Sequence, residues 1–267
     1  MEKVTVRTLH EMKARGEKIV ALTAYDAPTA RLLNEAGVDV LLVGDSVANV
    51  KLGYENTLPV TLEEMIHHTR AAKRGNSRAM LVTDMPFLTY EVDPREAVRQ
   101  VGRLIKAAGA EAVKVEGASP SILASIRALI AANIPVMGHV GLTPQSIYRL
   151  GGYRVQGRLA KEASALKAGA RALEKAGVFA LVLEAVPARL AAVLTRSLKI
   201  PTIGIGAGPR CDGQILVVDD LLGLTPLPRP KFVRAYAELR AVAVRAVGAW
   251  REDVRRGRFP GPAESYD

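Results

Sequence analysis

The chain has 267 residues, of which 49% are hydrophobic and 24% charged, and its formal net charge is +10. This balance predicts a compact globular protein and excludes a disordered or fibrous chain. The single cysteine, Cys211, cannot form an internal disulfide, and the sequence has no run of about 18 apolar residues that would span a bilayer. We therefore expect a cytoplasmic protein without a membrane partner.

The positive charge is concentrated in the second half of the chain. Residues 1–133 carry a net charge of +1, and residues 134–267 carry +9. Between Arg229 and Arg258, nine basic and three acidic residues are scattered through an Ala/Val-rich helical pattern with few aromatic residues. This pattern favours a solvated helix surface over a nucleic-acid-binding stripe, so no nucleic-acid partner is expected. A polyanion-binding protein is the alternative.

Short apolar segments alternate with longer amphipathic segments, which is typical of β/α units around a parallel sheet. Strands are predicted at residues 19–24, 38–44, 79–84, 112–116, 135–139, 179–184, 201–205 and 215–221. Helices are predicted at residues 28–36, 62–74, 94–108, 120–131, 159–176 and 188–198, followed by a long helix at 231–256.

The residues at the predicted helix starts agree with these segments. Thr61 and Glu64 have the spacing of a capping box, and Asp93 and Ser119 each precede a proline. Eight alternations predict an α/β fold, a single (β/α)₈ TIM-barrel domain over residues 1–267 with an extra N-terminal segment and a long C-terminal helix. A doubly wound sheet is less favoured because it usually has fewer strands.

Polar residues stand at the C-terminal ends of the predicted strands, where a barrel builds its active site from several strands at once. They are Asp45 and Ser46 on strand two, Asp84 on strand three, Lys114 and Glu116 on strand four, His139 on strand five and Glu184 on strand six. Lys114 and Glu116 are two residues apart, so their side chains must point to the same face. The unusually long loop at 141–157 is also expected to serve a site.

Three of these residues are carboxylates that would repel one another unless a cation lay between them. Oxygen ligands suit a hard ion such as Mg²⁺, so Asp45, Asp84 and Glu116 are predicted to form a divalent-metal site. The alternative is that each acid caps the helix that follows it. The coincidence of three strand ends favours the metal site.

The residues next to Glu184 in sequence carry no charge. Burial among them should raise the pKa of Glu184 toward the range that suits a general base. The alternative for Glu184 is an ion pair with an arginine at the barrel rim. Lys114 is expected either to bind a substrate carboxylate or oxyanion, or to neutralise the acids. His139 is assigned to substrate binding, with a hydrogen-bonded structural role as the alternative.

Other candidate residues carry weaker signals. His67 and His68 fall in a helical pattern and are expected on the surface. The segment from Gly204 to Gly208 resembles a phosphate-binding turn, but Pro209 follows it, so a tight β/α turn is favoured. Cys211 has no neighbouring base in sequence and is expected to be structural.

Several of these segments resemble the ketopantoate hydroxymethyltransferase family. The resemblance is carried, in order, by GDSVANVKLGYENTLPVTLEEMIHHTRAAKRG, DMPFLTY, KVEG, MGHVGLTPQS, LEAVP and IPTIGIGAGPRCDGQILVVDDLLG. It extends from about Thr5 to Tyr236. Ala118 follows KVEG where a further glycine is common, and the Arg-rich tail beyond Ala237 carries no motif of the family.

The resemblance implies a barrel of the phosphoenolpyruvate/isocitrate lyase group that assembles as a homo-oligomer, a decamer of two pentameric rings. It implies transfer of a hydroxymethyl group from the co-substrate 5,10-methylenetetrahydrofolate to 3-methyl-2-oxobutanoate (α-ketoisovalerate), which gives 2-dehydropantoate in pantothenate biosynthesis through a Mg²⁺-stabilised enolate. The alternative is a Mg²⁺-dependent lyase of the related group that needs no folate.

The resemblance also implies a role for each residue at the strand ends. Glu184 would be the proton acceptor, and Ser46 and Lys114 would contact the keto acid. Asp45 and Asp84 would serve both the Mg²⁺ ion and the substrate, with Glu116 completing the metal shell.

Overall fold

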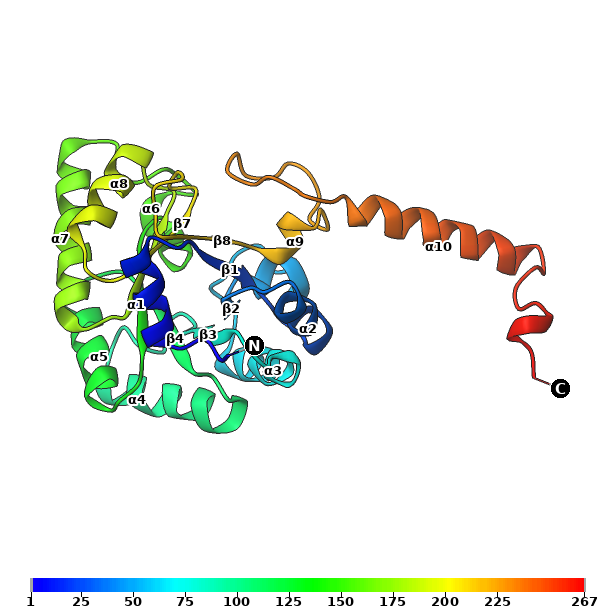
Figure 1. The fold of residues 1–267 in the computed structure, drawn as a ribbon, viewed down its shortest axis with the longest axis horizontal. Helices are drawn as coiled ribbons and strands as arrows, with labels where there is room; N and C mark the ends of the chain where they lie inside the picture. Colours follow the sequence, from blue (N-terminus) through cyan, green and yellow to red (C-terminus); the bar gives the residue numbers. More distant parts are fainter. Residues whose placement is uncertain (1, 267) are drawn as a thin grey trace. The chain divides into compact units, whose positions relative to one another are not determined.

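The computed structural model describes residues 2–266 and shows a closed barrel of eight parallel strands in the order β1 to β8 (Figure 1). β8 pairs with β1 and closes the barrel. The strands are β1 (Ile19–Thr23), β2 (Val40–Val43), β3 (Met80–Asp84), β4 (Ala112–Glu116), β5 (Val136–Gly141), β6 (Ala180–Glu184), β7 (Thr202–Ile205) and β8 (Gly213–Leu216). The predicted (β/α)₈ fold is confirmed.

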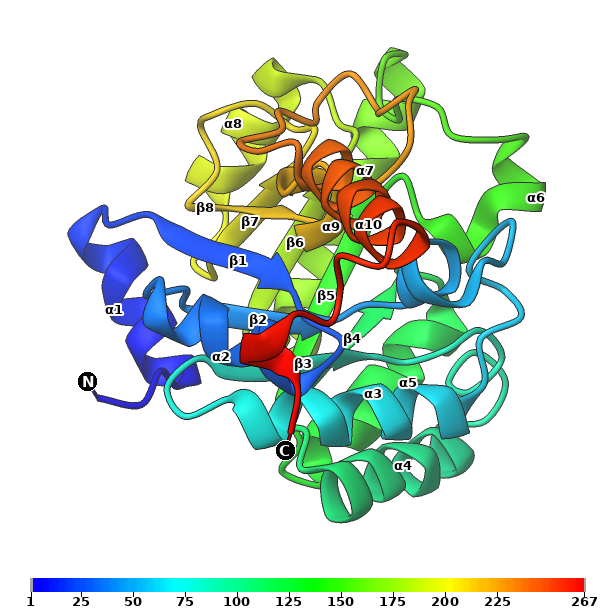
Figure 2. The same cartoon turned by 90° about the vertical axis from the view of Figure 1, so that its right-hand side faces the viewer.

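The helices that alternate with the strands of the barrel surround the sheet, as Figure 2 shows for the same molecule turned by 90°. The helices of the described chain are α1 (Val6–Arg15), α2 (Ala27–Glu35), α3 (Leu62–Gly75), α4 (Pro94–Arg103), α5 (Pro120–Ala131), α6 (Ile147–Leu150), α7 (Ala160–Ala176), α8 (Ala188–Ser197), α9 (Val218–Leu221) and α10 (Leu239–Arg255). Short irregular helices are η1 (Ala48–Leu52), η2 (Leu104–Ala108), η3 (Pro144–Ser146) and η4 (Pro262–Glu264). The predicted caps are confirmed at Thr61, Asp93 and Ser119.

The eighth strand and the last helix differ from the predicted ranges. The β1–β8 ladder ends where Leu216 pairs with Leu22, and the following residues form α9 in place of the predicted strand 215–221. Helix α10 begins at Leu239, not at 231. Backbone N–H groups of Tyr236 and Leu239 bond to carbonyl groups at the end of α9, so residues 231–238 fold back and are not helical.

The chain divides into two compact units, residues 1–217 and 218–267. The first unit contains the whole barrel, and the second contains α9, α10 and η4. Within the second unit, Trp250 packs edge-on against Phe259 with ring centroids 6.1 Å apart. Among the helices of residues 2–266, none is long and apolar enough to cross a membrane.

Helix α1 closes the N-terminal end of the barrel. Leu9 and Met12 of this helix are buried in the same apolar cluster as the inward residues of the strands. Ala112 of β4 belongs to this cluster, and because side chains alternate along a strand, Lys114 and Glu116 face the same interior nearer the C-terminal end. Polar chemistry is therefore confined to the end of the barrel opposite α1.

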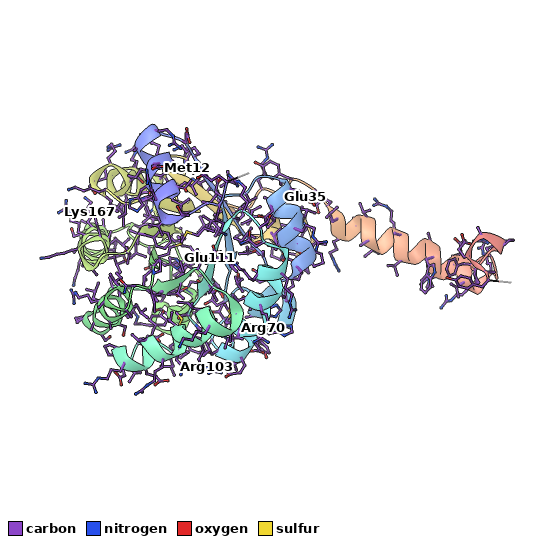
Figure 3. The ribbon with its side chains drawn as sticks, turned by 60° about the horizontal axis from the view of Figure 1, so that its bottom comes forward. Met12, Glu35, Arg70, Arg103, Glu111 and Lys167 are labelled. Carbon is purple, nitrogen blue, oxygen red and sulfur yellow. The ribbon has the colours of Figure 1, made fainter. Side chains whose placement is uncertain are left out.

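Glu111, just before β4, joins three segments of the barrel wall. Its carboxylate lies 2.8 Å from Nζ of Lys73 on α3 and 2.9 Å from Nζ of Lys3, and it accepts a hydrogen bond from the backbone N–H of Leu81 on β3. Burial alone would raise the pKa of Glu111, but these donors outweigh it and lower the pKa below 4.5. Figure 3 labels Glu111 among the side chains.

We predict that Glu111→Gln lowers the free energy of unfolding by about 1–2 kcal/mol at pH 7 because two charge-assisted hydrogen bonds are lost. A folded-state pKa below the unfolded value gives stability that is present above about pH 4.5 and is lost as the pH falls through the folded pKa. Urea denaturation at pH 7 and pH 3 should therefore show a difference between variant and wild type that shrinks in acid.

Glu63→Gln is the matched control, because Glu63 makes an exposed ion pair with Arg103. Its effect should stay below about 0.5 kcal/mol. An equal effect of the two substitutions would contradict the role given to Glu111.

Candidate active site

The structure brings the predicted strand-end residues together at the C-terminal end of the barrel. Nζ of Lys114 lies 2.8 Å from Oδ1 of Asp84 and 3.7 Å from Oε1 of Glu116. Asp45 joins the group because its backbone N–H donates to Oδ2 of Asp84 at 3.0 Å. Asp45, Asp84, Lys114 and Glu116 are each at most 5% exposed. Three carboxylates and one ammonium group thus share one buried site.

The electrostatics of the site follow from this burial. Burial, followed by repulsion from Asp84 and Glu116, raises the pKa of Asp45 to about 8. Burial also raises the pKa of Asp84, although Lys114 opposes the shift. Burial alone would lower the pKa of Lys114, but the surrounding carboxylates outweigh it and raise the pKa. Burial and mutual repulsion therefore disfavour ionisation of Asp45 and Asp84, whereas the same carboxylates favour the charged form of Lys114.

Helix capping does not explain the acids. The helix η1 that follows β2 has Val47 at its N-cap and no side-chain cap. Helices α3, α4 and α5 are capped by Thr61, Asp93 and Ser119, and not by Asp45, Asp84 or Glu116. Oδ1 of Asp84 and Oε1 of Glu116 are buried without a hydrogen-bond partner in proper geometry. The predicted capping alternative is therefore wrong.

His139 lies between Glu116 and Glu184. Its Nδ1 is 3.3 Å from Oε1 of Glu116, and its Nε2 is 3.3 Å from Oε2 of Glu184 without the alignment of a hydrogen bond. Burial and Lys114 would lower the pKa of His139, but the two carboxylates outweigh them and raise it to about 9. The expectation that Glu184 has no charged neighbour is wrong: residues adjacent in sequence are uncharged, but β5 supplies His139, in place of the arginine considered as an alternative.

The backbone after Glu184 is held in an unusual conformation. Ala185 has a φ of 47°, in the left-handed region that few residues other than glycine adopt. The carbonyl groups of Glu184 and Ala185 accept hydrogen bonds from the N–H groups of Leu142 and Gln156, both in the loop after β5. This loop therefore fixes the end of the strand that carries Glu184.

Three residues of the site were missed by sequence reasoning. Tyr25, just after β1, shares a 2.8 Å hydrogen bond with Oγ of Ser46. Gln145 lies in the 141–157 loop, where its Nε2 donates to Oδ2 of Asp45, and Tyr90 in the loop after β3 bonds to Gln145. Tyr25 could have been found from its place at a strand end, whereas Gln145 and Tyr90 come from long loops whose path the sequence pattern does not predict.

The weaker candidates lie outside this cluster. His67 is exposed as expected, but His68 is half-buried and bonds through Nδ1 to the carbonyl oxygen of Tyr25. A Cβ atom at Gly204 would lie 2.9 Å from Sγ of Cys211, so this turn packs tightly against the buried thiol. Burial raises the pKa of Cys211, which fits the predicted structural role.

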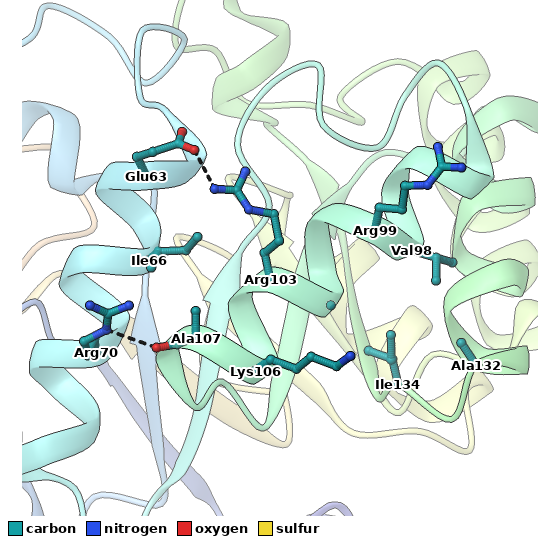
Figure 4. Close-up of a pocket in the computed structure, with 11 residues that line it drawn as sticks. Glu63, Ile66, Arg70, Val98, Arg99, Arg103, Lys106, Ala107, Ala132 and Ile134 are labelled. Atoms are coloured by element: carbon teal, nitrogen blue, oxygen red, sulfur yellow. Dashed lines mark hydrogen bonds and ion pairs between the residues drawn. The ribbon is translucent and has the colours of Figure 1, made fainter.

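A groove of about 770 Å³ on the outer wall does not contain any of the predicted site residues (Figure 4). Arg103 at its edge pairs with Glu63 at 2.7 Å, and Nε of Arg70 donates to the carbonyl oxygen of Ala107. Figure 3 shows Arg70 and Arg103 on neighbouring helices. The charged side chains of the groove are arginines, one lysine and Glu63, whose carboxylate is already paired with Arg103. The candidate active site is therefore the strand-end cluster.

Comparison with known proteins identifies relatives of the whole chain. The family described as ketopantoate hydroxymethyltransferase matches residues 3–262, so the match includes most of the Arg-rich tail that sequence motifs left unassigned. The 3-methyl-2-oxobutanoate hydroxymethyltransferase of Moorella thermoacetica is 54% identical over 264 residues, covering 99% of this chain and 98% of the relative. The enzyme of the same name from Geotalea uraniireducens is 53% identical over 262 residues, covering 98% of each.

Two solved structures share the fold. Phosphonopyruvate hydrolase in complex with oxalate and Mg²⁺ has a TM-score of 0.63 and 15% identity, and the alignment covers 99% of this chain and 92% of that one. A 2,3-dimethylmalate lyase of the PEP mutase/isocitrate lyase superfamily has a TM-score of 0.58 and 16% identity, with 98% and 91% covered. The predicted barrel fold is therefore shared with a structure of that superfamily.

At Gly141, the last residue of β5, the start of the following loop lies so close to β6 that there is no room for a side chain. A Cβ atom at Gly141, where φ is +106°, would lie 2.1 Å from the carbonyl oxygen of Glu184. We predict that Gly141→Ala lowers the free energy of unfolding by at least about 2 kcal/mol, measured by urea denaturation.

Gly151→Ala in the same loop is the control, since a Cβ atom there meets nothing within 4 Å. Its cost should be limited to the backbone strain of about 1 kcal/mol at a positive φ. If Gly141→Ala were no more destabilising than this control, the close approach of the loop to β6 would be refuted.

Proposed function

The chain belongs to the ketopantoate hydroxymethyltransferase family, and we propose that it transfers a hydroxymethyl group from 5,10-methylenetetrahydrofolate to 3-methyl-2-oxobutanoate, forming 2-dehydropantoate in pantothenate biosynthesis. The observation that carries this proposal is the buried strand-end cluster of Asp45, Asp84, Lys114 and Glu116. It combines an excess of carboxylate charge for a dication with an ammonium group for a 2-oxo acid.

The donor set of the cluster fits Mg²⁺. Its ligands would be the hard oxygen atoms of Asp45 and Asp84, with Glu116 completing the shell. A dication would offset the burial and the repulsion that raise the pKa of Asp45. It would share with Lys114 the oxygen atoms of Asp84 and Glu116 that have no hydrogen-bond partner in proper geometry. Residues 2–266 hold no ready-made cluster of three or more His, Cys, Asp or Glu side chains for an ion. Oxygen atoms of substrate and water would therefore share the shell, as is usual for Mg²⁺.

Bound there, Mg²⁺ would supply a Lewis acid that stabilises the negative charge developing on the 2-oxo oxygen when C3 loses its proton. Lys114 stays protonated beside Asp84 and binds the carboxylate of the keto acid. The hydroxyl group of Ser46, held by Tyr25, provides a second polar contact to the keto acid. These groups fix the substrate with C3 toward β6.

Glu184 accepts the proton from C3. Its side chain is 16% exposed at the end of β6, so it is accessible to a bound substrate, whereas Glu116 is buried against Lys114. His139 lies against Glu184 and limits the positions its carboxylate can take. As the C3–H bond breaks, its electron pair moves into the C2–C3 bond and places negative charge on the 2-oxo oxygen. C3 then bonds to the methylene carbon of the folate, and the electron pair of one carbon–nitrogen bond moves onto nitrogen. When the second carbon–nitrogen bond breaks, water supplies the hydroxyl group to the carbon and a proton to the departing tetrahydrofolate.

We predict that Glu184→Gln binds Mg²⁺ and keto acid but loses exchange of the C3 proton in deuterated water. An amide has no basic oxygen at neutral pH, so exchange followed by NMR should fall by at least about 100-fold. Glu63→Gln on the outer wall should exchange like wild type. Undiminished exchange in Glu184→Gln would remove it from the role of base.

Folate dependence tests the function as a whole. The enzyme should convert 3-methyl-2-oxobutanoate only when 5,10-methylenetetrahydrofolate is present, measured as formation of 2-dehydropantoate by mass spectrometry. The similar solved structures are only 15–16% identical and show the fold alone, so they favour no second activity. Cleavage of a 2-oxo or 2-hydroxy acid without folate would instead support the lyase alternative.

A further inference from the structure

Gln145 in η3 contacts the ends of three strands. Its Nε2 donates hydrogen bonds to Oδ2 of Asp45 and to the carbonyl oxygen of Met85, each at 2.9 Å. Its backbone N–H donates to Oε2 of Glu116 at 3.1 Å. Both amide hydrogens are committed to fixed acceptors in a buried setting. One neutral residue therefore holds one oxygen atom of each of two carboxylates.

Tyr90 determines which way the amide of Gln145 faces. Its hydroxyl group donates to Oε1 of Gln145 at 2.9 Å and accepts from the backbone N–H of Glu116 at 3.1 Å. A phenol has a single proton, so these two bonds divide its donor and acceptor roles between two partners. If the amide were turned over, Oε1 would face the carboxylate of Asp45 and the carbonyl group of Met85, and both contacts would be repulsive. Tyr90 thus keeps the donor side of Gln145 toward Asp45.

The pair orients the carboxylates without neutralising them. Lys114 already contributes the nearby ammonium group, and a second cation in place of Gln145 would compete with a divalent ion for the same oxygen atoms. Amide and phenol donors hold the carboxylates by hydrogen bonds and leave their formal charge in place. Hydrogen bonds of this kind to ligand carboxylates commonly set metal affinity.

We propose that Tyr90 and Gln145 are a positioning pair that holds Asp45 and Glu116 in the orientation in which they receive the divalent cation. This inference rests on the proposed function, because it assigns the two carboxylates to that cation. The pair acts through the carboxylates and not on the reacting atoms. If the pair only stabilised the fold, its removal would weaken the packing of the loop after β5 but leave the cation affinity of the folded protein unchanged.

Tyr90→Phe and Gln145→Met test the proposal, since each keeps most of the side-chain volume. Gln145→Met removes the side-chain hydrogen bonds to Asp45 and Met85 and leaves the backbone bond to Glu116. Tyr90→Phe removes the hydroxyl group that bonds to Gln145 and to the backbone N–H of Glu116. Mn²⁺ affinity of the folded protein is measured without substrate from the electron paramagnetic resonance signal of free Mn²⁺. We expect each variant to weaken this affinity by about tenfold or more. The reduced kcat of Tyr90→Phe at low Mg²⁺ should be restored by raising the Mg²⁺ concentration.

Ser125→Ala is the matched control. Oγ of Ser125 donates to the backbone carbonyl oxygen of Tyr90, so its loss disturbs the same buried tyrosine but neither carboxylate contact. It should lower the melting temperature and leave Mn²⁺ affinity unchanged. The positioning role is overturned if Tyr90→Phe and Gln145→Met bind Mn²⁺ as tightly as wild type does. It is also overturned if Ser125→Ala weakens Mn²⁺ affinity as much as those two variants do.

Asp84→Asn separates this inference from the proposed function. Wild type should bind Mn²⁺, and Asp84→Asn should bind it much more weakly. Absence of Mn²⁺ binding by wild type, or full binding by Asp84→Asn, would overturn the metal site and the function with it. A third outcome would overturn the positioning pair alone: wild type binds Mn²⁺, Asp84→Asn weakens the binding, and Tyr90→Phe and Gln145→Met leave it unchanged.

Discussion

The burial of three carboxylates in one place is the constraint on which the rest of this end of the barrel depends. Taking a charge out of water costs several kcal/mol unless opposite charge or hydrogen-bond donors replace the solvent. Asp45, Asp84 and Glu116 receive that replacement from Lys114, from Gln145 and from backbone N–H groups. Burial and the neighbouring carboxylates still raise the pKa of Asp45, so these donors do not fully replace the solvent at that residue. Under the proposed function, a bound dication would supply further positive charge there.

The barrel allows this concentration of charge because its register is fixed by apolar residues elsewhere. On β4, Ala112 lies in the apolar interior, and the period of two along the strand carries Lys114 and Glu116 to the same side. A shift of one residue would turn both charges toward the surrounding helices. The register of β4 therefore decides both that Ala112 packs in the apolar interior and that Lys114 and Glu116 face the interior at the C-terminal end of the barrel.

The sequence was sufficient to predict the first seven strands, the helix caps and the residues at the strand ends, because hydrophobic periodicity and capping patterns are local signals. The predicted eighth strand overlaps the observed one only at residues 215–216. Local signals failed where the deciding contact comes from a distant segment. Glu184 has uncharged neighbours in sequence but meets His139 from β5, and the start of α10 is delayed because Tyr236 and Leu239 bond to the end of α9. Tyr90 and Gln145 escaped notice for the same reason, since irregular loops place their side chains.

Helix α1 determines from which end of the barrel a ligand can enter and leave. Leu9 and Met12 fill the interior beside the strand starts, so the axis is a dead end and not a tunnel. Any molecule that reaches Glu184 must come and go by one mouth. Under the proposed function, the small keto acid would bind deepest in the barrel. The bulky pteridine donor would bind nearer the opening and block the exit of the keto acid. The first reactant to enter would then be the last to escape, and the product would wait for the spent donor to depart.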